Sequence, residues 1–224
     1  MNIFEGLDAR VNTDPLVSLD TQDVKKTTIC ILDWDDTCIA SSWLGSINRP
    51  VDAEDLDDFA ILSRCVIAII SKAKMHGRLI IITNAMSGWV QESCTEYMPS
   101  VLPYLSDVPI VSAQDKYSHL YTNPTHWKIV AFRDEVFRGI AANSKLNIIS
   151  IGDGPAEFTA VNSLQHLIPE SLNINLITKG VKLLEKPHIK LLIKQLDAVY
   201  ADMDAIIELQ ENINRKMQMK DVIE

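Results

Sequence analysis

Apolar and polar positions form blocks along the chain that predict short strands and amphipathic helices in turn. Runs rich in Ile, Leu and Val, each too short for a helix, predict buried strands over 27–32, 79–82, 108–111, 147–151 and 174–177. Apolar residues three and four positions apart predict helices over about 52–75, 89–98 and 127–141, with another that begins near Ala156. Because strands and helices alternate, we expect an α/β fold of three layers, a Rossmann-like parallel sheet with helices on both faces.

A further helical pattern follows Pro187. Apolar residues recur three and four apart from Ile189 to Met217, and Pro187 suits the first turn of a helix. We expect the first half of this helix to cover the sheet of its own domain. The second half, which includes Ile213, has more apolar surface than one domain needs, so we expect it to pair with another helix in a homo-oligomer.

The chain divides into three segments on this pattern. We expect residues 1–26 to form an N-terminal arm, because they are polar, include Pro15 and show no sustained hydrophobic period of a helix or strand. The α/β domain takes 27–186, and the C-terminal helical segment takes 187–224. A chain of 224 residues with 47% hydrophobic residues can bury a full core as one such domain.

Charge and cysteine usage narrow the class of protein. The formal net charge is −9, and no basic stretch is present to bind a phosphate backbone, so nucleic acid is not an expected partner. The four cysteines, Cys30, Cys38, Cys65 and Cys94, lie far apart, which predicts reduced core residues rather than a disulfide or zinc framework. Neither a signal peptide nor an apolar run of about 20 residues is evident. We therefore expect a cytoplasmic protein that does not enter a membrane.

The first expected strand ends at the carboxylates of Asp33, Asp35 and Asp36. Negative charges this close repel one another unless they lie in water or face a cation, so an acidic turn in solvent is one interpretation. Two other strands end at Thr83–Asn84 and at Gly152–Asp153–Gly154, where glycines would let backbone approach a ligand. Since the carboxyl ends of parallel strands share one edge of the sheet, the sequence predicts a site there.

The residue types at this edge suit phosphoryl transfer. Two carboxylates from different strand ends, with a main-chain carbonyl, make a partial oxygen shell for Mg²⁺. Asp33 can attack phosphorus, and Asp35 can protonate the leaving oxygen and later activate water. Thr83 and Lys128 would hold the phosphoryl oxygens and offset their charge.

These residues resemble the motifs of the haloacid dehalogenase-like superfamily, and specifically of its aspartate-nucleophile phosphatases. The first motif, Asp-x-Asp-x-Thr after an apolar strand, is matched by residues 33–37. The second, an apolar strand that ends in Thr or Ser, is matched by Thr83. A Lys ahead of the last site strand is matched by Lys128, and Gly-Asp followed by another acid is matched by Gly152–Asp153 with Glu157.

The resemblance implies a Mg²⁺-dependent phosphoric monoester hydrolase that acts through an aspartyl-phosphate on Asp33. It makes Asp35 the acid and base and, through its carbonyl, a metal ligand; Asp33 and Asp153 are the other ligands. Thr37 and Asn84 are expected to bind substrate. The form Asp-Trp-Asp-Asp-Thr, followed by Ser-Ser-Trp-Leu and later by Thr-Asn-Ala-x-x-Gly-Trp-Val, looks like a eukaryotic branch of the superfamily.

Two of the matches have alternatives. Lys116 and Lys145 compete with Lys128, which could also merely solvate a helix face. Glu157 departs from the commoner Asp and stands at an expected helix start, so it either supports the metal ligands from behind or favours the helix terminus. The four tryptophans, Trp34, Trp43, Trp89 and Trp127, are interpreted as packing and flap residues, because no basic residues interleave with them as in a base-stacking surface.

The intervals between the motifs bear on the substrate. A loop, a helix and a strand nearly fill the chain between Thr37 and Thr83, and ordinary sheet elements fill the chain from Thr83 to Lys128. We therefore expect no large cap domain and an open site, which suits a phosphate on a bulky or macromolecular substrate or needs a neighbouring subunit as its lid. A non-catalytic binding or scaffolding module on the same fold is the alternative function. A dehalogenase or a phosphorylation-receiving signalling domain fits the motifs less well.

Overall fold

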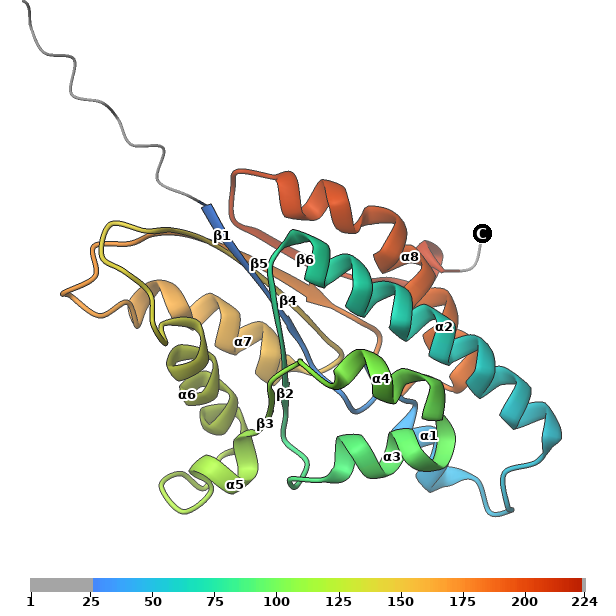
Figure 1. The fold of residues 1–224 in the computed structure, drawn as a ribbon. Helices are drawn as coiled ribbons and strands as arrows, with labels where there is room; N and C mark the ends of the chain where they lie inside the picture. The colour runs from blue at the N-terminus through green and yellow to red at the C-terminus, as the bar shows by residue number, and fades with distance from the viewer. Residues whose placement is uncertain (1–25, 223–224) are drawn as a thin grey trace, which may run out of the picture.

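One parallel sheet forms the centre of the molecule (Figure 1). The computed structural model describes residues 26–222, so the expected arm, apart from Lys26, lies outside the described residues. The six strands are β1 (Lys26–Leu32), β2 (Arg78–Thr83), β3 (Ile110–Ser112), β4 (Lys145–Gly152), β5 (Asn175–Lys182) and β6 (Ile213–Lys216). Their order is β3-β2-β1-β4-β5-β6, and every neighbouring pair is parallel. The expected three-layer α/β fold is confirmed.

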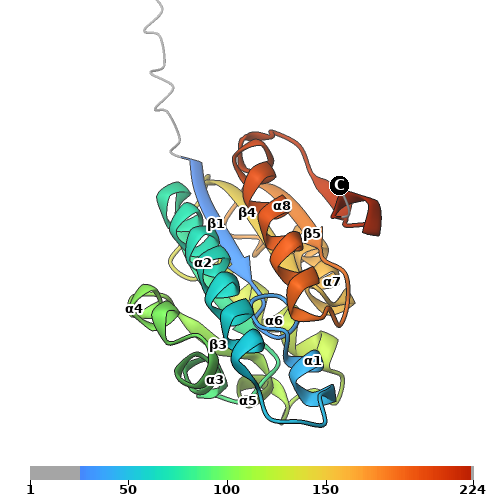
Figure 2. The same ribbon diagram turned by 90° about the vertical axis from the view of Figure 1, so that its right-hand side faces the viewer.

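Helices cover both faces of this sheet (Figure 2). One face packs against α2 (Ala53–His76), α3 (Trp89–Tyr97), α4 (Leu102–Leu105) and α8 (Ile189–Glu208). The other face packs against α5 (Ala113–Tyr117), α6 (Pro124–Val136) and α7 (Pro155–Ser163). Alternate residues of each strand serve the two layers: Cys30 and Leu32 face the first, and Ile29 and Ile31 the second.

The boundaries of the helices follow from local capping. Helix α2 begins where the Asp52 side chain accepts a hydrogen bond from the Asp55 backbone N–H, and the Asp55 side chain accepts one from the Asp52 N–H. Helix α6 begins earlier than expected, because the Asn123 side chain caps it, and it ends at Val136 rather than at 141. The sequence pattern missed the short helices α1 (Ser41–Ser46), α4 and α5, which lie in expected loops.

The expectation for the C-terminal segment is wrong in its second half. Helix α8 ends at Glu208, and Ile213–Lys216 forms strand β6 beside β5. Ile213 and Met217 pack against the core of this chain, which removes the surplus apolar surface that suggested a homo-oligomer. The error has a simple cause: two apolar residues four apart also fit a strand and the residue after it, so they do not establish a helical period.

Buried polar side chains anchor the end of α8 to the sheet. The Lys179 Nζ, on β5, donates to the carbonyl oxygens of Ile207 at 2.9 Å and Leu209 at 2.7 Å. Asn147, on β4, donates its side-chain N–H to the same Ile207 oxygen at 3.0 Å. A cation at a helix C-terminus is favourable, because the last carbonyls have no partner within the helix. These contacts define where the helix stops.

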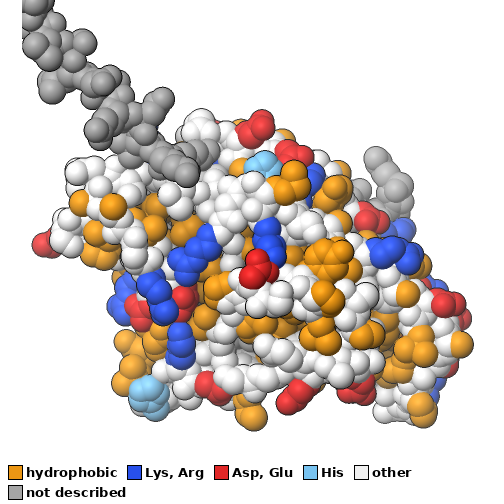
Figure 3. All heavy atoms as spheres, in the orientation of Figure 1, with side chains coloured by type: hydrophobic (Ala, Val, Ile, Leu, Met, Phe, Trp, Pro, Cys, Tyr) orange, Lys and Arg blue, Asp and Glu red, His pale blue; other side chains and the backbone are white. Residues whose placement is uncertain are grey.

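A basic cluster lies over α5 and α6 (Figure 3). Its Lys and Arg side chains surround the buried Glu135: Lys116 Nζ lies 3.0 Å, Arg138 Nη2 2.8 Å and Arg78 Nη2 3.7 Å from its carboxylate oxygens.

Across residues 26–222, no large domain is inserted between the strands. In the same stretch, no helix combines the length and the apolarity that crossing a membrane requires.

Candidate functional site

The carboxyl ends of the central strands bring the predicted site residues to one edge. Strand β1 lies between β2 and β4, with Leu32 opposite Ile81 on one side and Ile151 on the other. The Asp33 backbone N–H continues the ladder by donating to the Ile151 carbonyl at 3.0 Å. Asp33 therefore lies directly after the end of β1, at the same level as the loop after β4 that carries Asp153.

Lys128 is the centre of the charged cluster. It lies on α6 and is fully buried, and its Nζ is 2.6 Å from Asp33 Oδ1, 2.7 Å from Glu157 Oε1 and 2.5 Å from the Ile82 carbonyl oxygen. Burial alone lowers the pKa of Lys128, but the charges of Asp33 and Glu157 outweigh burial and raise that pKa above its ordinary value. The interpretation of Lys128 as a solvated residue is wrong.

The two competing lysines lie elsewhere. Lys116 pairs with Glu135 in the basic cluster, and Lys145 opens β4 at the opposite edge of the sheet. Of Lys116, Lys128 and Lys145, only Lys128 therefore reaches the carboxylates at the strand ends.

Three carboxylates meet beside the Lys128 ammonium. One oxygen each of Asp33, Asp153 and Glu157 lies within 4.8 Å of the other two. Burial raises the pKa of Asp33, and burial together with the nearby charges of Glu157 and Asp36 raises the pKa of Asp153 to about 7. Burial acts the same way on Glu157, but Lys128 lowers the pKa of that carboxyl overall. With all three carboxyls ionised, the cluster would carry more negative charge than Lys128 neutralises, which is why the pKa values of Asp33 and Asp153 are raised rather than lowered.

The donor set of this cluster fits a hard divalent cation. Glu157 Oε2 is buried and has no hydrogen-bond partner among the described residues. Carboxylate oxygens are the preferred ligands of Mg²⁺, and an added cation would offset both the mutual repulsion and the burial that raise the pKa of Asp153. Glu157 stands in the first turn of α7, where a carboxylate favours the helix terminus, and it also pairs with Lys128.

Gly152, the last residue of β4, and Gly154, in the loop after it, lie close to the Glu157 side chain. A Cβ on Gly152 would lie 2.6 Å from Glu157 Cγ, and a Cβ on Gly154 would lie 2.7 Å from Glu157 Oε2. These positions therefore make room for the Glu157 side chain. In the described structure, the close approach is to a neighbouring side chain of the same loop and helix.

The other two acids of the first loop point in separate directions. Asp35 Oδ1 accepts a hydrogen bond from the Trp89 indole N–H at 2.9 Å, and Oδ2 accepts one from the Thr83 hydroxyl at 3.3 Å. Asp36 has a φ of 52° and accepts from the Ser42 N–H at 2.9 Å and from the Ser42 hydroxyl at 2.5 Å. Asp33 and Asp36 are buried, so the interpretation as an acidic turn in solvent is wrong.

The remaining predicted residues tie the loops together. The Thr37 hydroxyl accepts a hydrogen bond from the Asp153 backbone N–H at 3.0 Å, which joins the loops after β1 and β4. The Thr83 hydroxyl accepts from the Ala85 N–H at 2.9 Å. Asn84 donates to the Pro124 carbonyl at 3.4 Å, and its Oδ1 is buried with no hydrogen-bond partner among the described residues.

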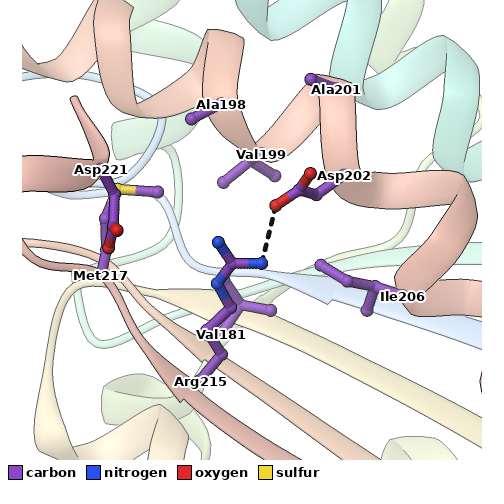
Figure 4. A pocket seen from close by; sticks show the side chains of 9 residues that line it. All are labelled: Val181, Ala198, Val199, Ala201, Asp202, Ile206, Arg215, Met217 and Asp221. Carbon is purple, nitrogen blue, oxygen red and sulfur yellow. Dashed lines mark hydrogen bonds and ion pairs between the residues drawn. The ribbon is translucent and has the colours of Figure 1, made fainter. Parts of the chain in front are cut away.

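Two hollows bear on where a ligand could lie. The first has a volume of about 590 Å³ and is lined by Asp35, residues 84–87, Trp89 and Glu92. The second, of about 280 Å³, lies between α8 and the β5–β6 side of the sheet, and the ion pair of Arg215 and Asp202, at 2.7 Å, crosses it (Figure 4). Two predicted site residues, Asp35 and Asn84, line the first hollow and none lines the second, so the first is the candidate substrate site. Asp33, Lys128 and Asp153 line neither hollow.

Trp89 is the residue of this site that the sequence interpretation missed. The sequence predicts a packing or flap residue here; Trp89 does pack against the core, and its indole N–H also contacts Asp35. Its position directly after Gly88, at the start of the helix that follows the second site strand, is the sequence signal that places it near the site.

Comparison of the chain with protein-family models, curated proteins and solved structures found no match.

Proposed function

We propose that this protein is a Mg²⁺-dependent phosphatase of the haloacid dehalogenase-like type, which hydrolyses a phosphomonoester through an aspartyl-phosphate. The observation that carries the proposal is the buried contact of Lys128 with Asp33 and Glu157, beside Asp153. Candidates for a nucleophile, for an acid and base and for a set of metal ligands lie at one sheet edge, around a buried lysine whose charge offsets that of the carboxylates. Such a set is what phosphoryl transfer requires.

Asp33 is the nucleophile in this proposal. Lys128 binds Asp33 Oδ1 and fixes the carboxylate, which leaves Oδ2 to attack phosphorus. As the Oδ2–P bond forms, the bond from phosphorus to the leaving oxygen breaks, and Asp35 gives that oxygen a proton. Water then attacks phosphorus, its proton returns to Asp35, and the Oδ2–P bond breaks to release phosphate.

Asp33, Asp153 and the main-chain oxygen of Asp35 would hold the Mg²⁺, with Glu157 supporting them. When bound, the ion supplies positive charge that offsets the charge of the phosphoryl group. The three N–H donors of Lys128 already face Asp33, Glu157 and the Ile82 carbonyl, so this lysine contributes its charge and the orientation of Asp33. Thr83 supplies a hydroxyl at the same edge. No inserted domain covers this edge within residues 26–222, which supports a bulky or macromolecular phosphorylated substrate. The net charge of −9 argues against nucleic acid as that substrate. We place the reaction in the cytoplasm.

The test is hydrolysis of p-nitrophenyl phosphate with Mg²⁺ and after removal of Mg²⁺ by a chelator. The wild type should turn over only with Mg²⁺, and Asp33→Asn should abolish turnover, because the amide cannot form the phosphoenzyme. Asp107→Asn, at an exposed acid that pairs with Lys74, is the matched control and should keep wild-type activity. Turnover that survives Asp33→Asn would refute the assignment. A wild type that neither turns over nor binds Mg²⁺ would favour a non-catalytic module.

A further inference from the structure

Helix α3 is hydrogen-bonded to Trp34 and Asp35, two adjacent residues of the loop that follows β1. The Trp34 indole N–H donates to the Ser93 hydroxyl at 2.9 Å, and the Trp89 indole N–H donates to Asp35 Oδ1 at 2.9 Å. Trp89 is the first residue of α3 and follows Gly88, whose φ is 96°, and its backbone N–H donates to the Met86 carbonyl at 3.2 Å. The backbone of Trp89 is therefore held by a defined turn and by the start of a helix, and the indole bond to Asp35 orients the ring.

The Asp35 carboxyl and the Trp89 ring both line the hollow of about 590 Å³. Asp35 is partly exposed there, and its contact with the Thr83 hydroxyl, at 3.3 Å, is long for an O–H···O hydrogen bond. The Trp89 bond, at 2.9 Å, has ordinary length. The hydrogen bond from Trp89 to the Asp35 carboxyl is therefore shorter and better formed than the one from Thr83.

We propose that Trp89 is a positioning residue for Asp35, which acts through its indole N–H to hold the carboxyl toward a leaving group in this hollow. The inference rests on the proposed function. Because Trp89 occupies Oδ1, the transferable proton is carried on Oδ2. That proton passes to the leaving oxygen as the ester bond breaks, and the proton of the attacking water returns to Oδ2; the indole proton stays on its nitrogen in both steps.

The position of a general acid matters most when the leaving group is a strong base. p-Nitrophenolate leaves without a proton, whereas phenolate, with the basicity of a tyrosine side chain, is helped by one. Trp89→Phe keeps an aromatic ring but removes the N–H. We expect it to lower kcat/KM for phenyl phosphate by about tenfold, part of the 10²–10⁴ that a general acid contributes, and to change p-nitrophenyl phosphate by less than about twofold.

The ratio of the two substrates keeps this test valid even when part of the variant fails to fold, because both substrates report the same active molecules. Trp127→Phe is the matched control, since it also removes an indole N–H, one that donates to the Tyr121 carbonyl at 2.5 Å. The control should keep the wild-type ratio. In an Asp35→Asn background, Trp89→Phe should have no further effect on phosphoenzyme formation from phenyl phosphate, because the group it positions is gone.

The outcomes separate this inference from the proposed function. If the wild type does not turn over, or if turnover survives Asp33→Asn, the proposed function fails. If Asp33-dependent turnover is present but Trp89→Phe changes both substrates equally, or neither, the positioning role is refuted and the phosphatase stands. An additive effect of Trp89→Phe on Asp35→Asn would also overturn the positioning role.

Discussion

Replacement of Lys128 by Met should destabilise the fold more than any change of a surface lysine. The variant keeps a long side chain in a fully buried position but removes the ammonium that contacts Asp33, Glu157 and the Ile82 carbonyl. Removal of one partner from a buried ion pair typically costs 3–5 kcal/mol, because the other charge is left without compensation. Here two carboxylates and one carbonyl lose the same donor, so we expect a loss of about 4 kcal/mol in the free energy of unfolding.

Urea unfolding at pH 7 in a chelator measures this loss directly, with Lys116→Met as the matched control. Lys116 is half exposed, and its partner Glu135 keeps Arg138, so the control should lose less than about 1 kcal/mol. Added Mg²⁺ should restore part of the stability of Lys128→Met, because the ion binds the carboxylates only when they are folded together. A loss below about 1 kcal/mol for Lys128→Met would refute the buried pairing.

Two further predictions concern parts of the chain away from this cluster. Lys179→Met should lower the free energy of unfolding by about 2–4 kcal/mol, because the Ile207 and Leu209 carbonyls lose a charged donor, and hydrogen exchange should rise first at the end of α8. Hydrogen bonding to Arg49 lowers the pKa of Asp55 to about 2, so the stability from this pair is complete above the ordinary pKa and is lost as the pH falls from about 4 to 2. Melting temperatures of the wild type and Arg49→Gln should therefore converge at acid pH; an unchanged difference at pH 2 would contradict the pairing.

Local sequence patterns were sufficient for five of the six strands and for the edge at which the candidate site lies. The apolar runs that end at Asp33, Thr83 and Asp153 are buried strand ends, and parallel pairing places such ends together. What these patterns do not encode is the direction of each side chain. Asp35 turns toward Trp89, and Glu157 turns toward Lys128, because α3 and α6 pack where they do.

The C-terminal segment shows a second limit of the sequence. The spacing of Ile213 and Met217 predicts a helix, yet the chain leaves α8 at Leu209, whose ψ of 139° is extended. The contacts that end the helix come from Lys179 and Asn147 on two other strands. A pattern read along one segment carries no information on donors that distant segments supply.

The packing of α8 has a consequence for when the site can exist during synthesis. Asp33, Lys128, Asp153 and Glu157 all precede α8 in the chain. The apolar side chains of β1 and β4 that support them, among them Leu32 and Ile151, lie in the same buried layer as residues of α8. On a ribosome, every catalytic candidate would thus emerge before the helix that finishes this layer. Because α8 completes this layer, we expect the site to hold its geometry only after α8 has emerged and packed on the sheet.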